Sequence, residues 1–258
     1  PEVFPVPPIR GGAVEAGIYE VARRLEGHGV HVLGIADPEL PLTGQDGHVN
    51  YWRFRPARLD RWLLSTYKLP FKRSASRWYY WPYARWAGVH LRFLLPDIVN
   101  VKTRVQFVPW LRRAFPAAKI VLGIHQVSSL SAAQVWSERA IASCDAITGC
   151  SRFIVDELHR RYPKTCSKTR VIYNGVDTRR FGPWWDQPQV RARVREDLGA
   201  NGGPAILFTG RLVEQKGLHV LAEAFARLAR RWPNARLVIA GGRTYSDDTE
   251  TPYVRRVK

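Results

Sequence analysis

The stretch 206-ILFTGRLVEQKG-217 decides the fold of the second half of the chain. Its first residues form an apolar run that predicts a buried strand ending near Gly210. Lys216-Gly217 then predicts a turn, and residues 218–231 carry apolar side chains at helical spacing. A strand, a glycine turn and an amphipathic helix in this order are typical of a parallel α/β sheet.

Two cations flank this predicted turn. Arg211 follows the strand, and Lys216 stands directly before the helix. Because a helix N-terminus offers free N–H groups and the positive end of the helix dipole, the junction suits a diphosphate. Turns with the same residues also occur where the cations are only solvated, so the spacing alone leaves both interpretations open.

Short apolar strands alternate with helix-length segments in the rest of the chain. Helical spacing from Val14 to Leu25 predicts a first helix that ends at Gly27 and Gly29. The predicted strands are 30–35, 97–101, 119–124, 146–148, 171–173, 205–209 and 235–240. This alternation predicts doubly wound parallel sheets.

The predicted elements fall into two domains. Residues 1–182 form the first, and residues 205–258 begin a second α/β domain after a Pro, Gly and charge-rich linker at 183–204. The chain opens in a loop, 1-PEVFPVPPIRGG-12, and closes in a polar stretch. We therefore expect the first strand of the first domain and the last strands of the second to lie beyond these ends.

Two further candidate site features belong to the first domain. Gly11-Gly12 stands directly before the first predicted helix, so its backbone can approach an anion closely. A flexible turn is the alternative. His125 follows the strand 119–124 at its carboxyl end, where open parallel sheets bind ligands. A structural histidine at this position is equally compatible with the sequence.

Charge is concentrated in residues 53–113. The chain has a net charge of +18, and this segment holds fourteen Lys and Arg residues against two aspartates. Within it, a helix at 77–95 would carry Arg77, Arg85 and Arg92 on one face and many aromatic residues on the rest. Such a helix suits an anionic membrane surface, or it packs its aromatics inward and solvates its arginines. No nucleic-acid recognition motif accompanies the charge, and no nucleic-acid partner is expected.

Several classes of protein lack sequence support. The chain contains no Asp-x-Asp, HExxH or Gly-x4-Gly-Lys-Ser/Thr motif, so neither a metal site nor P-loop hydrolysis is predicted. It contains no apolar run of about 18 residues and no basic, apolar and small-residue leader. These observations predict a cytoplasmic protein. In the membrane alternative, residues 53–113 would bring it into peripheral contact with the inner face of the plasma membrane.

The motifs, in their order, resemble those of retaining family-4 glycosyltransferases of the GT-B fold. They are Gly11-Gly12-x-x-Glu15, 27-GHGVHV-32, His125 after a strand, 150-CSRFI-154, 172-IYNGVD-177, 210-GRLVEQKG-217 and 237-LVIAGG-242. The resemblance extends over nearly the whole chain. The stretches 245-YSDDTETPYVRR-256 and Pro-x-Arg-Gly-Gly-Ala are most similar to the spore coat polysaccharide branch of the family.

The resemblance implies a two-domain, hexosyltransferase-like enzyme that moves a sugar with retention from a nucleotide diphosphate sugar. Its acceptor would be a glycan, a lipid-linked molecule or a small molecule in cell-surface polysaccharide biosynthesis. Arg211 and Lys216 would neutralise the leaving diphosphate without a metal or other cofactor. Gly11, Gly12 and Gly241 would also bind the donor, and His125 would act near the sugar.

One motif of the family is absent from this sequence. The glutamate-x7-glutamate motif, which holds the donor ribose and sugar hydroxyls, would lie after residue 258, so we expect this chain by itself to be inactive. An alternative of a different class is a non-catalytic protein that binds polyanions or membrane surfaces through residues 53–113. The resemblance favours the enzyme.

Overall fold

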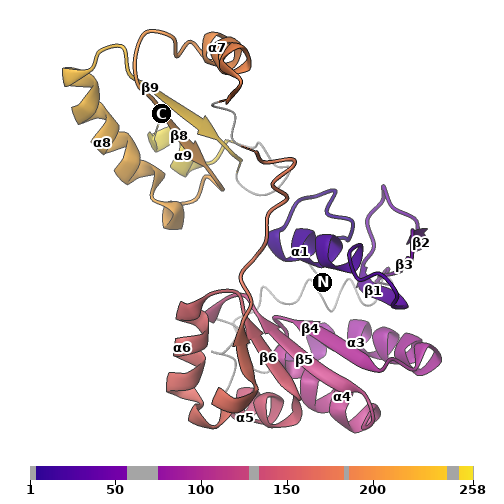
Figure 1. Cartoon of the computed structure of the whole chain (residues 1–258). Coiled ribbons are helices and arrows are strands. Elements are labelled where there is room, and N and C mark those ends of the chain that lie inside the picture. The colour runs from indigo at the N-terminus through magenta and orange to yellow at the C-terminus, as the bar shows by residue number, and fades with distance from the viewer. Residues whose placement is uncertain (1–3, 57–74, 128–133, 183–185, 243–249, 258) are drawn as a thin grey trace. The chain divides into compact units, whose positions relative to one another are not determined.

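The chain forms two compact units, and each is described by itself. Figure 1 shows the computed structural model, which describes residues 4–56, 75–127, 134–182, 186–242 and 250–257. The first unit is Pro1–Gly175 and the second is Val176–Lys258. The boundary falls within the sequence 172-IYNGVD-177.

The first unit begins with a small mixed sheet. Its elements are α1 (Ala13–Ala22), β1 (Val30–Ile35), β2 (Thr43–Asp46) and β3 (Val49–Phe54). The strand order is β1-β3-β2, with β1 and β3 parallel and in register from Val30 opposite Val49, and β2 antiparallel to β3. The side chains of Val6, Ala22, Val32, Val49 and Tyr51 form the core between this sheet and α1.

A second sheet of the first unit is entirely parallel. Its elements are α3 (Ala75–Leu94), β4 (Ile98–Lys102), η2 (Val105–Phe107), α4 (Val108–Ala114), β5 (Lys119–Ile124), α5 (Gln134–Ser143), β6 (Ala146–Gly149), α6 (Arg152–Arg161), η4 (Pro163–Lys168) and β7 (Thr169–Val171). The strand order is β4-β5-β6-β7. Because every pair is parallel, the carboxyl ends of these strands lie along one edge.

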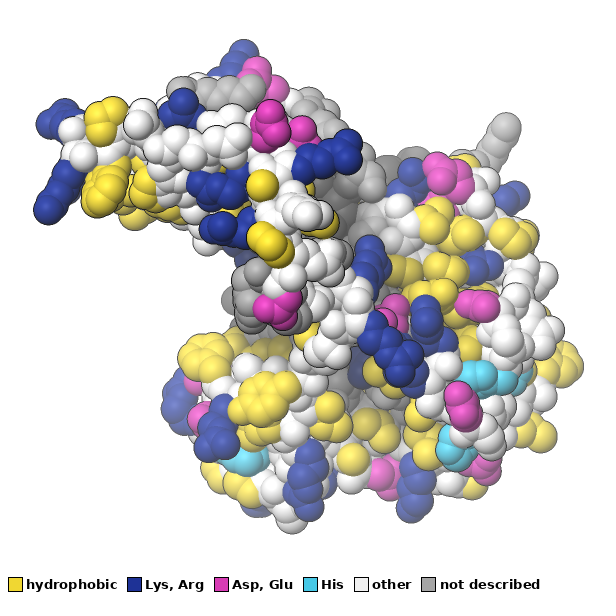
Figure 2. Space-filling model, turned by 45° about the horizontal axis from the view of Figure 1, so that its top comes forward, with side chains coloured by type: hydrophobic (Ala, Val, Ile, Leu, Met, Phe, Trp, Pro, Cys, Tyr) yellow, Lys and Arg dark blue, Asp and Glu magenta, His cyan; other side chains and the backbone are white. Residues whose placement is uncertain are grey.

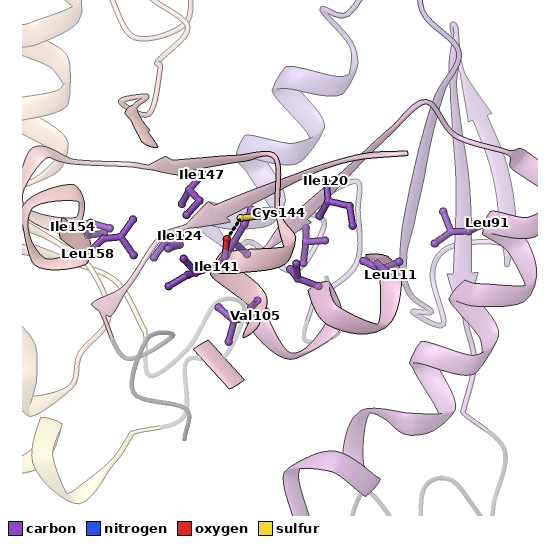
Figure 3. Close-up of a cluster of buried hydrophobic side chains, with 14 residues drawn as sticks. Leu91, Val105, Leu111, Ile120, Ile124, Ile141, Cys144, Ile147, Ile154 and Leu158 are labelled. Carbon is purple, nitrogen blue, oxygen red and sulfur yellow. Dashed lines mark hydrogen bonds between the residues drawn. The ribbon is translucent and has the colours of Figure 1, made fainter. Parts of the chain in front are cut away.

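One large hydrophobic cluster stabilises this parallel sheet. Figure 3 shows Ile120, Ile124 and Ile147 from the strands packed with side chains of the surrounding helices, including Ile141 and Leu158. Alternate residues of β5 contribute to it because successive side chains of a strand point to opposite faces. The cluster therefore fixes the strand ends that carry the candidate site residues of this unit.

A cavity of about 710 Å³ separates the two sheets. It is lined by residues of β1 and β4, by Val21 of α1, by Leu25 after that helix and by Leu91 of α3. Neither of these two strands has a strand partner on this side among the described residues.

The second unit contains one strand-helix-strand motif. Its elements are α7 (Pro188–Asp197), β8 (Ala205–Thr209), η6 (Glu214–Lys216), α8 (Leu218–Arg231), β9 (Arg236–Ala240) and α9 (Pro252–Val257). The strands β8 and β9 are parallel and in register from Ala205 opposite Arg236. In α8, Leu218 is buried, while other residues of its apolar face, such as Phe225, are half-buried.

The predicted parallel α/β pattern is confirmed, with corrections in detail. The expected strands 30–35, 119–124 and 205–209 match the structure to the residue. The first helix ends at Ala22 rather than at Gly27, because the residues after Ala22 form turns. The strand predicted at 171–173 is Thr169–Val171, and the β2-β3 hairpin was not predicted. The predicted linker 183–204 includes α7.

Candidate functional site

The turn after β8 is the first part of the site. The N–H of Gly210 donates to the carbonyl of Ala240 at 3.0 Å, and the N–H of Leu212 donates to the carbonyl of Gly242 at 2.8 Å. These bonds extend the pairing of β8 with β9 past both strand ends. Arg211 lies between the two bonded residues, and its side chain is exposed.

Lys216 and Gly217 carry the chain from this turn into α8. Lys216 ends the short helix η6, and Gly217 follows with φ 71°, a left-handed conformation that glycine adopts without a steric penalty. Gly217 is the N-cap of α8 and offers no side-chain acceptor to the first N–H groups of the helix. The exposed side chain of Lys216 therefore stands at a helix N-terminus whose dipole attracts anions.

Helix α9 contacts residues before and after this turn. The hydroxyl of Tyr253 accepts a hydrogen bond from the backbone N–H of His219 at 3.2 Å and contacts Nδ1 of the same residue at 3.0 Å. Arg256 pairs with Glu214 at 3.6 Å and lies over the Tyr253 ring, 5.7 Å from its centre. Glu214 and His219 flank Lys216-Gly217 in sequence, so α9 fixes the residues before and after the candidate anion site.

Gly241 directly follows β9 and lies against the backbone of Gly210, which directly follows β8. It has φ 152°, and a Cβ added to it would overlap the carbonyl oxygen of Gly210. The residue is thus required by the approach of two backbone segments at the end of the sheet. Its predicted contact with a donor stays a prediction.

The Gly11-Gly12 turn of the first unit is held by an ion pair. Arg10 donates from Nε and Nη2 to the two carboxylate oxygens of Asp37, each at 2.9 Å. These hydrogen bonds, and one from the backbone of Glu39, hold the pKa of Asp37 below its usual value. The bidentate geometry fixes the loop directly before Gly11.

Gly12 is the N-cap of α1 and is buried, with φ 105°. A Cβ at this position would overlap the carboxylate of Glu15, which is folded back over the glycine. The arrangement is one half of a capping box, in which a glutamate at the third helical position returns to the N-cap. A phosphate bound at Gly12 would share this space with the carboxylate of Glu15.

His125 directly follows β5 and is half-buried. The thiol of Cys150, which follows β6, donates to the backbone carbonyl of His125 at 3.7 Å. Burial lowers the pKa of the His125 imidazole, and the ammonium of Lys102 lowers it further. The imidazole is therefore neutral at pH 7 and can both donate and accept a hydrogen bond.

The predicted site residues thus fall into two groups. Gly11, Gly12 and His125 belong to the first unit, and Arg211, Lys216 and Gly241 belong to the second. The structure brings Arg211 and Gly241 to one end of the β8-β9 sheet.

Sequence reasoning missed Lys102 and Tyr253. Lys102 carries a charge at the end of an apolar strand, which was a usable signal. Tyr253 gave none, because its contact with His219 spans 34 residues of sequence.

The structure describes part of the basic aromatic segment 53–113. Tyr83 and Trp86 of α3 pack inward on Phe54, with ring centres 5.9 and 5.6 Å apart, while Arg85 and Arg92 are exposed. Trp62, Tyr67 and Phe71 lie outside the described residues, as does the side chain of Arg77. For Tyr83 and Trp86, the expectation of inward packing with solvated arginines is confirmed.

Charge is also distributed beyond this segment. Figure 2 shows Lys and Arg side chains spread over both units on the face it presents.

Among the described helices, none combines the length and the apolar composition needed to cross a bilayer. The described residues also contain no group of three or more His, Cys, Asp and Glu side chains placed to hold a metal ion.

Two curated proteins are similar to this chain over nearly its whole length. Spore coat protein SA of Bacillus subtilis is 29% identical over 99% of the chain, and the putative glycosyltransferase YtcC of the same organism is 30% identical over 98%. The chain spans 63% and 58% of the lengths of these relatives.

Two solved structures share the fold. One is described as trehalose-6-phosphate from E. coli bound with UDP-2-fluoro glucose, and its TM-score is 0.67 at 16% identity. The match includes 99% of this chain and 67% of the solved chain. The other is a glycosyltransferase from Rickettsia africae, with a TM-score of 0.61 at 19% identity. This match includes 93% of this chain and 67% of the solved chain. The fold of this chain is accordingly GT-B.

Two family models match the chain, one in each part. The model described as Glycosyl transferases group 1 matches residues 190–254, and the model described as Glycosyltransferase Family 4 matches residues 11–180. The second match covers more than half of the chain. The chain therefore belongs to the Glycosyltransferase Family 4 proteins.

Proposed function

We propose that the protein transfers a sugar, with retention, from a nucleotide diphosphate sugar to an acceptor used in cell-surface polysaccharide biosynthesis. The observation that carries this proposal is the turn from β8 to α8, where Arg211 follows the strand and Lys216 stands directly before the N-cap of the helix. The first unit would bind the acceptor and the second unit the donor. The name of Spore coat protein SA supports the cell-surface role.

Fixed charges would stabilise the leaving diphosphate in this mechanism. When the bond between the sugar and the diphosphate breaks, negative charge develops on the phosphate oxygens. Arg211 and Lys216, together with the N–H groups at the start of α8, would stabilise that charge without a metal ion. Gly11, Gly12 and Gly241 would contact the donor through their backbones, and neutral His125 would form hydrogen bonds to the transferred sugar.

Nucleotide binding and product analysis together test this function. UDP, ADP and GDP are titrated into the purified protein by calorimetry, because the nucleotide is not determined by the described residues. A transfer reaction by the full-length protein with the matching sugar nucleotide is then followed by NMR of the anomeric proton. We expect binding of one diphosphate and a product with the anomeric configuration of the donor. Failure to bind any nucleoside diphosphate, or an inverted product, contradicts the proposal.

Tyr253 offers a test of how the turn is held. Tyr253→Phe keeps the ring but removes the hydroxyl that accepts from His219 N–H, so the start of α8 loses one constraint. We expect the Kd for the nucleoside diphosphate to rise about threefold to tenfold, since one such hydrogen bond contributes about 0.5–1.5 kcal/mol. Calorimetry measures the change.

Tyr173→Phe is the matched control, because Tyr173 is exposed and belongs to the first unit. Equal affinities for Tyr253→Phe and the unaltered protein would show that α9 has no part in donor binding.

A second candidate function is docking to an anionic membrane surface. The observation that favours it is the outer face of α3, where Arg85 and Arg92 lie near two exposed apolar residues, Val89 and Phe93, the latter 83% exposed. Basic and apolar side chains on one helical face are typical of interfacial helices. A cytoplasmic enzyme bound in this way at the inner face of the plasma membrane would meet a lipid-linked acceptor.

Vesicle sedimentation tests the docking function. The protein is expected to co-sediment with anionic vesicles at low ionic strength and to dissociate as salt rises, because each cation contributes about 1 kcal/mol and is screened within about 10 Å at 0.1 M salt. Replacing Arg85 and Arg92 with Gln should weaken binding. Arg227 and Arg230 of α8 are exposed and serve as the control pair. Equal binding to neutral vesicles would leave α3 as a packed helix with a solvated face.

A further inference from the structure

The side chain of Lys102 crosses the neighbouring strand at a glycine. Lys102 is the last residue of β4 and lies opposite Gly123 of β5 in the sheet register. A Cβ on Gly123 would lie 2.9 Å from Cδ and 3.1 Å from Nζ of Lys102, which is closer than ordinary contacts. The absence of a side chain at Gly123 is therefore what allows the ammonium to lie over β5.

This ammonium is half-buried, and no carboxylate among the described residues contributes to its electrostatic environment. Partial burial lowers the pKa of Lys102. Taking a cation out of water without a partner has a cost, and such groups are normally paired in folded proteins. Lys102 and the imidazole of His125 are close enough for the lysine charge to lower the pKa of the histidine.

The turn directly after Lys102 is strained. Thr103 has φ 62°, a left-handed conformation that is rare for a β-branched residue. Three hydrogen bonds impose it: Thr103 N–H donates to the Gly123 carbonyl at 2.8 Å, while Thr103 Oγ1 and the N–H of Arg104 donate to the Lys102 carbonyl at 2.7 and 2.8 Å. Strain of this kind persists where surrounding contacts enforce it and is concentrated at ligand sites.

These features meet at the edge of the sheet where ligands bind. Lys102 ends β4, His125 follows β5, and the carboxyl ends of parallel strands form the ligand-binding edge of open α/β sheets. An unpaired ammonium there has the chemistry to hold an anion, since lysine presents a compact charge and three donors.

We propose that Lys102 binds an anionic group of a substrate, a carboxylate or a phosphate, at the carboxyl ends of β4 and β5 beside His125. The inference rests on the proposed transferase function, because it assigns a chemical class to a substrate of that enzyme. The anion has two sources, the diphosphate of the donor and an acidic group of the acceptor. The experiment distinguishes them.

The imidazole signals of His125 provide a local readout for anion binding. They are recorded by NMR in the purified protein while inorganic phosphate or acetate is added. We expect these signals to shift with added anion in the unaltered protein and in Lys119→Gln. Lys119 is the matched control, because it lies at the other end of β5 with its side chain 71% exposed. In Lys102→Gln the anion affinity should fall at least about tenfold, as expected for the loss of a charge-assisted hydrogen bond. Lys102→Arg should retain part of it.

A competition experiment identifies the source of the anion. If a saturating nucleoside diphosphate displaces phosphate from the site, Lys102 binds the donor. If phosphate still shifts the His125 signals, Lys102 binds an acidic acceptor group. Either result supports the proposal, provided that the amide spectrum of Lys102→Gln matches that of the unaltered protein.

Two results overturn it: no response of His125 to phosphate, acetate or nucleoside diphosphate, or an equal response in Lys102→Gln. Failure of the transferase function itself would be seen separately, as the absence of nucleoside diphosphate binding by calorimetry.

Discussion

In the full-length protein, Lys216→Ala should reduce transferase turnover at least about tenfold to hundredfold. Each charge-assisted contact to charge that develops in the transition state contributes on the order of 2–4 kcal/mol, and about 1.4 kcal/mol corresponds to a factor of ten. Lys216 is exposed and lies directly before the N-cap of α8, so its removal deletes a charge without opening a core. Initial rates at saturating donor measure the effect.

The control for this substitution comes from α8, the helix that follows Lys216. Arg227 is an exposed cation of α8, and Arg227→Ala removes the same charge away from the turn. Arg211→Ala should resemble Lys216→Ala, because both side chains would contact the same diphosphate. Unchanged turnover after replacement of either residue would rule out its role in the clamp.

Gly241→Ala should destabilise the second unit and abolish donor binding. The added Cβ would overlap the carbonyl oxygen of Gly210, and Gly241 also has φ 152°, which alanine rarely adopts. Since both atoms in conflict belong to backbone segments, the sheet end must move. We expect a loss on the order of 2–4 kcal/mol in the free energy of unfolding, measured by urea denaturation of the second unit.

Gly202→Ala is the matched substitution for Gly241→Ala. A Cβ at Gly202 would have its closest contact at 3.6 Å, with the side chain of Asn234, an ordinary packing distance. This variant should retain both stability and affinity. If Gly241→Ala unfolds at the same urea concentration as Gly202→Ala, the close approach of β8 and β9 does not constrain the turn.

The elements that sequence predicted best are apolar strands bounded by glycine or charge. The strands at 30–35, 119–124 and 205–209 match because short apolar runs with such boundaries favour a strand. The burial predicted for 206–208 was wrong, since β8 pairs only with β9 among the described strands and Leu207 is 63% exposed. The β2-β3 hairpin was missed because β2, Thr43–Asp46, is polar and exposed apart from the half-buried Gly44. Its pairing with β3 depends on backbone hydrogen bonds that composition does not reveal.

The candidate site was predictable in its charged residues and not in their supports. Arg211, Lys216 and His125 stand at the ends of predicted strands or at the start of a predicted helix, positions at which ligands bind. The contacts of Tyr253 with His219 and of Lys102 with Gly123 depend on tertiary structure, which joins residues far apart in sequence.

The division of the first unit into two sheets gives helix α3 a role in its cooperativity. The described strands form two sheets, each with its own hydrophobic cluster. Helix α3 spans the division: the Tyr83 ring contacts Phe54 of the first sheet and Phe107, which follows β4, and its hydroxyl donates to the carbonyl of Leu33 at 2.9 Å. Any event that orders or displaces α3 should therefore change amide hydrogen exchange in both sheets at once.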